Sequence, residues 1–132
     1  MKTLCLDTNI LLRYLLDDDQ DQSSRARQLI DETPGFRFLL TDPVLCEITW
    51  VLERPRYGFS KEDVITALYG LLAHRRFIVQ DRHRVQLALD DYCRGPAGFA
   101  DYLILQIGKG LGAEKLITFD QKLLAEPHCR EP

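Results

Sequence analysis

The sequence has no apolar segment close to the ~20 residues that a bilayer-spanning helix requires. Its first residues also lack the pattern of a signal peptide, because Lys2 precedes only a short apolar run that ends at Asp7. The cysteines are scattered, with no C-x-x-C pair, at Cys5, Cys46, Cys93 and Cys129. This spacing argues against a zinc site or a disulfide framework and favours a protein of the reducing cytoplasm.

Positive charge is not in excess either, since 20 acidic and 17 basic residues give a net charge of −3. Taken alone, this balance argues against nucleic-acid binding, because phosphate contacts require Lys and Arg. The basic residues are unevenly placed, however, with a cluster at Arg75, Arg76, Arg82, His83 and Arg84. Repeats, low-complexity segments and linkers are absent as well, so the chain is predicted to form one domain, residues 1–132.

What the sequence does contain, four times, is a short apolar run that ends in aspartate and leads into a helical pattern. These runs occupy residues 3–7, 36–42, 76–81 and 114–120. Such runs are typical of strands buried on both faces of a parallel sheet. Helical patterns lie between them, at residues 9–16, 23–32, 42–53, from 60 onward, 82–94 and 99–109. The alternation predicts an α/β fold with a central, mostly parallel sheet of four to five strands flanked by helices.

Two of these helices carry clear start signals. Asp42 is expected as the N-cap of one helix, with Pro43 at its first position. Ser60, followed three residues later by Asp63, forms an approximate capping box for the next.

Four carboxylates are predicted at one edge of this sheet. Ligands of open parallel sheets bind outside the carboxyl ends of the strands, where the following helices begin. Asp7 and Asp120 end strands, Asp101 lies in the first turn of the helix at 99–109, and Glu47 lies beside the apolar face of the helix at 42–53. Taken singly, each is explained as a cap, a helix-dipole acid or a surface acid.

Their joint placement calls for a cation. Four gathered carboxylates repel one another and raise one another's pKa unless a cation neutralises them. Because all the candidate ligands are oxygen atoms, the pattern indicates a hard ion, Mg²⁺ or Mn²⁺. Such an ion can activate water and bind a phosphodiester, so the sequence points to metal-dependent hydrolysis.

At these same residues the sequence resembles a known family. LDTNILLRYL at the start, a helical Glu, FADYLI and ITFD, in that order, resemble PIN-domain ribonucleases, and in particular the VapC-type toxins of bacterial toxin–antitoxin pairs. The resemblance covers residues 2 to about 125. Each motif alone is weak, whereas all four in order are a specific signal.

The resemblance implies a PIN-like fold and a catalytic quartet of Asp7, Glu47, Asp101 and Asp120, with Asp7 and Asp101 as metal ligands. Thr8 and Thr118 match positions that support the site in the family. The implied activity is Mg²⁺-dependent endonucleolytic cleavage of RNA, inhibited by a VapB-like antitoxin, in a protein expected to be a homodimer. The polar, proline-broken tail AEPHCREP departs from the family, which commonly adds a final strand there.

Other classes of protein would carry different residues at these positions. A phosphatase with an aspartate nucleophile would place a second Asp at position 9, where this chain has Asn9. A dinucleotide-binding domain would have a Gly-rich first turn, which is missing. A catalytically silent PIN domain, acting as an RNA-binding or interaction module, would have lost one or more acids. A general nuclease of RNA processing stays open.

The charges are compatible with an RNA substrate once the quartet is set aside. Removing those four from the 20 acidic residues leaves 16 against 17 basic ones. Arg13 and the 75–84 cluster are the candidates for contacts with the RNA backbone, and Tyr14, Tyr57 and Tyr102 are candidates for base stacking or, alternatively, packing. The three histidines and the acidic run at 17–21 are interpreted as solvated.

Overall fold

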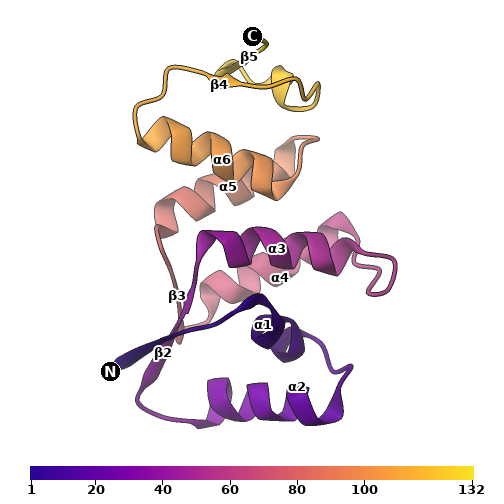
Figure 1. Ribbon diagram of the computed structural model, residues 1–132, viewed down its shortest axis with the longest axis vertical. Coiled ribbons are helices and arrows are strands. Elements are labelled where there is room, and N and C mark those ends of the chain that lie inside the picture. The colour runs from indigo at the N-terminus through magenta and orange to yellow at the C-terminus, as the bar shows by residue number, and fades with distance from the viewer. The chain divides into compact units, whose positions relative to one another are not determined.

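Three parallel strands, separated in the chain by helices, form the first sheet of the fold (Figure 1). The computed structural model, which describes residues 1–132, pairs β1 (Lys2–Cys5) with β2 (Phe36–Leu40) and β2 with β3 (Phe77–Val79), both in parallel. The register places Leu4 opposite Phe38 and Phe38 opposite Phe77. The fully buried Phe38 and Leu40 show that β2, the central strand, lies in the core, as its apolar sequence predicts.

The strands and helices form two compact units, Met1–Gln80 and Asp81–Pro132. Besides the three strands, the first unit contains α1 (Thr8–Leu15), α2 (Gln20–Arg27), the π-helical turn η1 (Gln28–Glu32), α3 (Asp42–Glu53) and α4 (Lys61–Ala73). The second contains α5 (Arg82–Arg94), α6 (Phe99–Gly110), β4 (Leu116–Ile117), the 3₁₀ turn η2 (Leu123–Ala125) and β5 (Cys129–Arg130). The α/β class and the parallel pairing of the strands are confirmed.

The prediction of one central sheet needs correction, because the five strands form a sheet of three and a separate sheet of two. β4 pairs in parallel with β5, and the Leu116 N–H donates to the His128 carbonyl over 2.9 Å. The prediction that the tail departs from the family pattern is therefore wrong in part, since Cys129–Arg130 does form a short strand. Only a short chain segment separates β4 from β5, so little loop-closure entropy opposes their pairing.

Capping residues set where the helices begin. Ser60 and Asp63 form the predicted capping box of α4 in full, with reciprocal bonds of 3.0 and 3.1 Å. The predicted N-cap of α3 is wrong by one residue, because Thr41 is the cap and Asp42 is the first residue of the helix. Asp42 belongs to the helix because its backbone N–H, one of the unpaired amides of a first turn, is satisfied by Gln80 Oε1 at 2.7 Å.

The segment predicted as one helix at 23–32 is longer and changes its hydrogen bonding. Asp19 caps α2 by accepting from the Gln22 N–H over 2.9 Å, so the helix begins at Gln20. From Gln28 the chain continues as the π-helical turn η1, which ends at Glu32. None of the helices combines the length and the apolar character that crossing a membrane would need.

Candidate functional site

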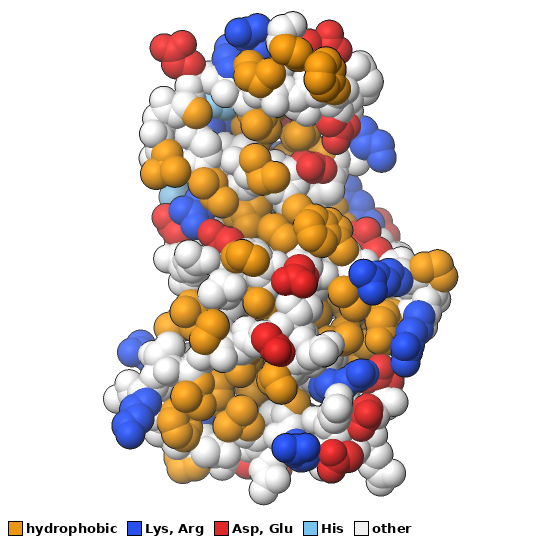
Figure 2. All heavy atoms as spheres, in the orientation of Figure 1, with side chains coloured by type: hydrophobic (Ala, Val, Ile, Leu, Met, Phe, Trp, Pro, Cys, Tyr) orange, Lys and Arg blue, Asp and Glu red, His pale blue; other side chains and the backbone are white.

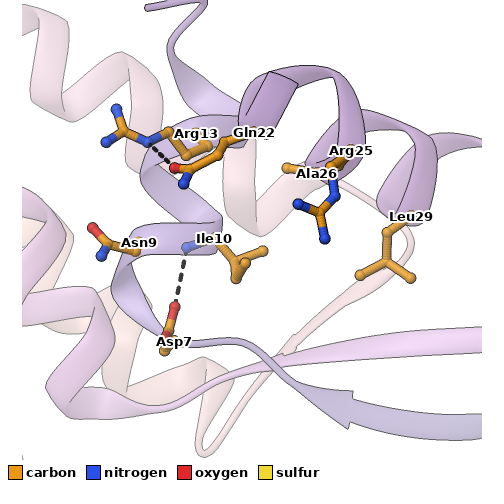
Figure 3. Close-up of a pocket in the computed structure, with 8 residues that line it drawn as sticks. All are labelled: Asp7, Asn9, Ile10, Arg13, Gln22, Arg25, Ala26 and Leu29. Carbon is orange, nitrogen blue, oxygen red and sulfur yellow. Dashed lines mark hydrogen bonds between the residues drawn. The ribbon is translucent and has the colours of Figure 1, made fainter. Parts of the chain in front are cut away.

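Asp7 joins the end of β1 to the start of α1 in the first unit. Its Oδ1 accepts the Ile10 N–H over 3.0 Å, as Figure 3 shows, so Asp7 is the N-cap of α1. The side chain is exposed and forms no ion pair, and its second oxygen has no hydrogen-bond partner. Thr8, half-buried, is the first residue of the helix.

Glu47 lies on α3, also in the first unit. The neighbouring Val44, Leu45 and Ile48 are buried in the core, whereas the Glu47 side chain is exposed. Its carboxylate makes neither a hydrogen bond nor an ion pair. Glu47 therefore presents two unengaged oxygen atoms to solvent.

Asp101 lies in the first turn of α6 in the second unit. Its Oδ2 accepts the Gly98 N–H over 3.1 Å, which closes the start of the helix. A Cβ at position 98 would lie 3.3 Å from this oxygen, so glycine there lets the carboxylate approach the backbone closely. Asp101 is half-buried and, like Asp7, keeps one oxygen without a partner.

The residue after Asp101 anchors the helix. Tyr102 is fully buried, and its hydroxyl accepts the Ala97 N–H over 3.2 Å. Burial raises the pKa of Tyr102 above its ordinary value, so the hydroxyl stays neutral over a wide pH range. This buried anchor holds the first turn of α6, and with it Asp101, in place.

Asp120 follows β4 in the second unit. Its Oδ1 accepts the Lys122 N–H over 2.9 Å, and its own N–H donates to Thr118 Oγ1 over 3.0 Å. Asp120 does not itself cap a helix, because the short 3₁₀ turn after it begins only at Leu123. The two side-chain bonds form a tight turn instead, which is typical of aspartate.

The structure thus divides the predicted quartet evenly, with Asp7 and Glu47 in one unit and Asp101 and Asp120 in the other. No group of three or more His, Cys, Asp or Glu side chains is close enough together to hold a metal ion. None of the four acids is neutralised by a Lys, Arg or His. Each keeps at least one unengaged carboxylate oxygen, which is the type of ligand that a hard divalent cation takes.

The basic residues predicted to contact RNA are divided between the two units. Arg75 and Arg76 belong to the first unit, and residues 82–84 begin α5 in the second. The Arg76 guanidinium donates to the carbonyls of Ile30, Thr33 and Phe36, so it is engaged in the fold. Its structural role removes it from the candidates for phosphate contacts.

Exposed basic side chains also lie elsewhere on the first unit. Arg54 and Arg56 occupy the connection between α3 and α4, where Lys and Arg side chains gather at the right edge of the face in Figure 2. Arg56 lies over the ring of Tyr57, with 5.4 Å from the guanidinium carbon to the ring centroid. Of the three tyrosines considered for base stacking, Tyr102 is excluded by its burial.

Some polar residues have partners that the sequence did not reveal. Asp18 is not simply solvated, because it accepts from Arg13 over 2.8 Å and thereby raises the pKa of that guanidinium. His74 is half-buried, and its Nε2 lies 3.3 Å from the Tyr14 hydroxyl and 3.6 Å from an Asp31 oxygen. The contacts of His74 join segments far apart in the sequence, so no local pattern predicts them.

Parallel strands with acids at their carboxyl ends define the class of this α/β protein, and the family comparison gives it a name. Residues 4–126 match the PIN domain family, so the chain belongs to that family. The match spans both units and includes all four acids. PIN domains are generally nucleases, and PIN nucleases generally use divalent metals. No curated protein matches the sequence.

Proposed function

We propose that this PIN domain is a Mg²⁺- or Mn²⁺-dependent endoribonuclease whose site is the quartet Asp7, Glu47, Asp101 and Asp120. The observation that carries the proposal is that these four carboxylates, all inside the matched family segment, have no cationic partner.

In this proposal, different residues bind the cation and accept the proton. The unengaged oxygens of Asp7 and Asp101 would hold the cation, while their other oxygens stay bonded to the amides of Ile10 and Gly98. A bound cation would supply positive charge for the phosphate and for activation of water. Glu47, whose carboxylate is unbonded, would serve as the proton acceptor.

The remaining members of the site act as support. Thr118 Oγ1 holds the Asp120 backbone, and the Asp120 carboxylate in turn closes the turn at Lys122. This arrangement fixes the direction of the free Asp120 oxygen, as a ligand or a water-orienting group requires. Thr8, beside Asp7, is proposed as the matching support in the first unit.

The experiment that tests the proposal is cleavage of labelled single-stranded RNA with and without divalent metal. We expect cleavage with Mg²⁺ or Mn²⁺ and none in excess EDTA, with activity restored when the metal is returned. Ca²⁺ serves as the control, since a larger ion with looser coordination supports this chemistry poorly. Undiminished cleavage in EDTA would overturn the metal mechanism.

We further propose that the protein is the cytoplasmic toxin of a VapBC-like pair, acting as a homodimer. The support is the resemblance of its motifs to VapC-type toxins, together with four unneutralised carboxylates. A guanidinium can pair with two carboxylate oxygens at once, so an antitoxin tail that carries Arg would bind the quartet and block it.

Co-expression with the product of the neighbouring gene tests this role. We expect a stable complex on size exclusion and loss of RNA cleavage within it. The same complex should dissociate more readily when Glu47→Gln and Asp120→Asn are combined, since two charges are lost. Separate elution of the two proteins at micromolar concentration would contradict the toxin role and leave the nuclease proposal intact.

A further inference from the structure

A hollow of about 340 Å³ lies between α1 and α2 and begins at Asp7. Figure 3 shows Asp7 at one end and Arg25 and Leu29 at the other. Its volume falls in the range of about 300–1,000 Å³ that is typical of small-molecule sites. All of its residues belong to the first unit, so the hollow is complete within that unit.

One wall of the hollow is apolar. Ile10, Ala26 and Leu29 form it, and Ile10 is 38% exposed. A flat ring placed against this wall would cover Ile10 and gain from the burial of apolar surface.

Gln22, one turn before Ala26 on α2, carries a carboxamide whose orientation is fixed. Gln22 Oε1 accepts the Arg13 Nε–H over 2.9 Å, and Arg13 is held by Asp18 at 2.8 Å. Because Arg Nε can only donate, the atom that faces it must be the amide oxygen. The Gln22 amide nitrogen is therefore the other atom, and it has two N–H groups without a partner in the protein.

The charges at the hollow favour a neutral ligand over a phosphate. Arg13 is already paired with Asp18, and the Asp7 carboxylate at the mouth repels an anion. Arg25 is tied to Asp21 only by an exposed contact of 3.5 Å, with 77% of its side chain accessible. Its planar guanidinium is thus free to lie against a ring bound in the hollow.

We propose that this hollow binds one base of single-stranded RNA beside the scissile phosphate, and that Gln22 reads the edge of that base. The inference rests on the proposed ribonuclease function and adds a specificity-determining residue to it. Gln22 donates to a carbonyl or ring-nitrogen acceptor, the apolar wall contacts one face of the base, and Arg25 covers the other.

The test is the base preference of cleavage, measured with RNA substrates that differ by one base next to the cut. In Gln22→Glu the carboxylate keeps the bond from Arg13 but replaces the N–H donors with an acceptor. We expect the order of preferred bases to change, with the ratio of rates between the best and the poorest base shifting about 3- to 10-fold. Gln20→Glu makes the same charge change on the same helix outside the hollow, and its base preference should match the wild type.

The outcomes separate this inference from the proposed function. If the wild type cleaves RNA and Gln22→Glu keeps the wild-type order of bases, the hollow does not read a base. If the wild type cleaves no RNA, the proposed function fails, and the base preference is then read from binding of metal-free protein to fluorescent oligo-A, oligo-C, oligo-G and oligo-U. Equal affinities of wild type and Gln22→Glu for all four would overturn the inference. Weakened binding of a partner protein with unchanged base order would assign the hollow to a peptide side chain instead.

Discussion

The two carboxylate oxygens of Asp7 have different surroundings. One accepts the Ile10 N–H and caps α1, and the other has no partner. Asp101 repeats this arrangement at α6, where Gly98 supplies the amide. Capping restricts the side-chain torsions, so each free oxygen is held in a defined direction. The capping function and the proposed metal-binding function are therefore compatible in one residue.

Replacement of these acids by Asn would preserve the helix cap and weaken the proposed metal binding. Its side-chain oxygen caps a helix about as well as that of Asp. Its amide nitrogen, however, cannot ligate a cation, and the residue carries no negative charge. Replacement of Asp7 or Asp101 by Asn thus tests metal binding with little change in the stability of the helix.

Tyr14 provides a second prediction at the scale of single residues. Its hydroxyl donates to Asp31 over 2.8 Å, and its ring meets Phe77 edge-on at 5.7 Å between centroids. Burial and this bond to a carboxylate raise the pKa of Tyr14 from 10.0 to about 12. Because the folded pKa is higher than the unfolded one, the network stabilises the fold fully below pH 10, and the contribution is lost as the pH rises towards 12.

The expected loss of unfolding free energy across that interval is on the order of 2 kcal/mol, since one pKa unit corresponds to about 1.4 kcal/mol. Tyr14→Phe should therefore lose less stability than the wild type as the pH rises through this range. Urea unfolding at a series of pH values measures the difference. Tyr57→Phe is the matched control and should follow the wild type, whereas parallel curves for Tyr14→Phe and wild type would refute the network's role.

The connection between α5 and α6 packs Gly95 closely against the Tyr102 side chain. A Cβ at Gly95 would lie 1.8 Å from the Tyr102 hydroxyl oxygen and 2.8 Å from the ring carbon that bears it. Tyr102 is fully buried and cannot turn away. Glycine at 95 is thus required by the packing of α6, and through Tyr102 it also determines the position of Asp101.

We expect Gly95→Ala to destabilise the protein by about 2–3 kcal/mol and to reduce RNA cleavage. Adding Tyr102→Phe should restore part of the stability, because the hydroxyl that causes the closest clash is removed. The control is Gly110→Ala, also in the second unit, where a Cβ would meet nothing within 4 Å. Denaturant unfolding of the four proteins gives the comparison, and equal midpoints for the two alanine variants would show that the contact does not constrain α6.

Local signals explain which elements were predictable. Both bounds of α5, residues 82–94, follow from the sequence, because Gly95-Pro96 ends the helix and Asp81 caps its start by accepting from Arg84 at 3.0 Å. The π-helical turn η1 was not predictable, since its end is fixed by Arg76, more than 40 residues away in the chain.

The division of the strands into two sheets could not be predicted from the sequence either. β4 has only two residues, and its partner β5 lies in a tail whose composition is polar and interrupted by proline. So short a strand carries little periodic signal, and the choice of partner depends on tertiary contacts that propensity does not encode.

At the scale of the whole molecule, the family match includes parts of both units. The PIN family match runs from residue 4 to residue 126, across the boundary after Gln80. Each unit supplies two of the four acids, so neither unit alone holds the proposed metal set.

The acids themselves could be selected from the sequence, because each lies at a strand end or in a helix near its start. The hollow beside Asp7 could not, since Gln22 and Arg25 reach it through the packing of α2 on α1. Their sequence neighbourhood is polar and acidic, which is typical of a solvated connection. Only the fold reveals that Arg13 and Asp18 orient Gln22.

Direct titration of Mn²⁺, followed by electron paramagnetic resonance, tests the central proposal that Asp7 and Asp101 are metal ligands. We expect the wild type to bind Mn²⁺, and Asp7→Asn in the first unit and Asp101→Asn in the second each to weaken binding roughly tenfold or more, about 1.4 kcal/mol. Asp17→Asn, an exposed acid paired with Arg27 at 3.2 Å, should bind Mn²⁺ like the wild type. Equal Mn²⁺ affinity in the wild type and in both quartet variants would contradict the account.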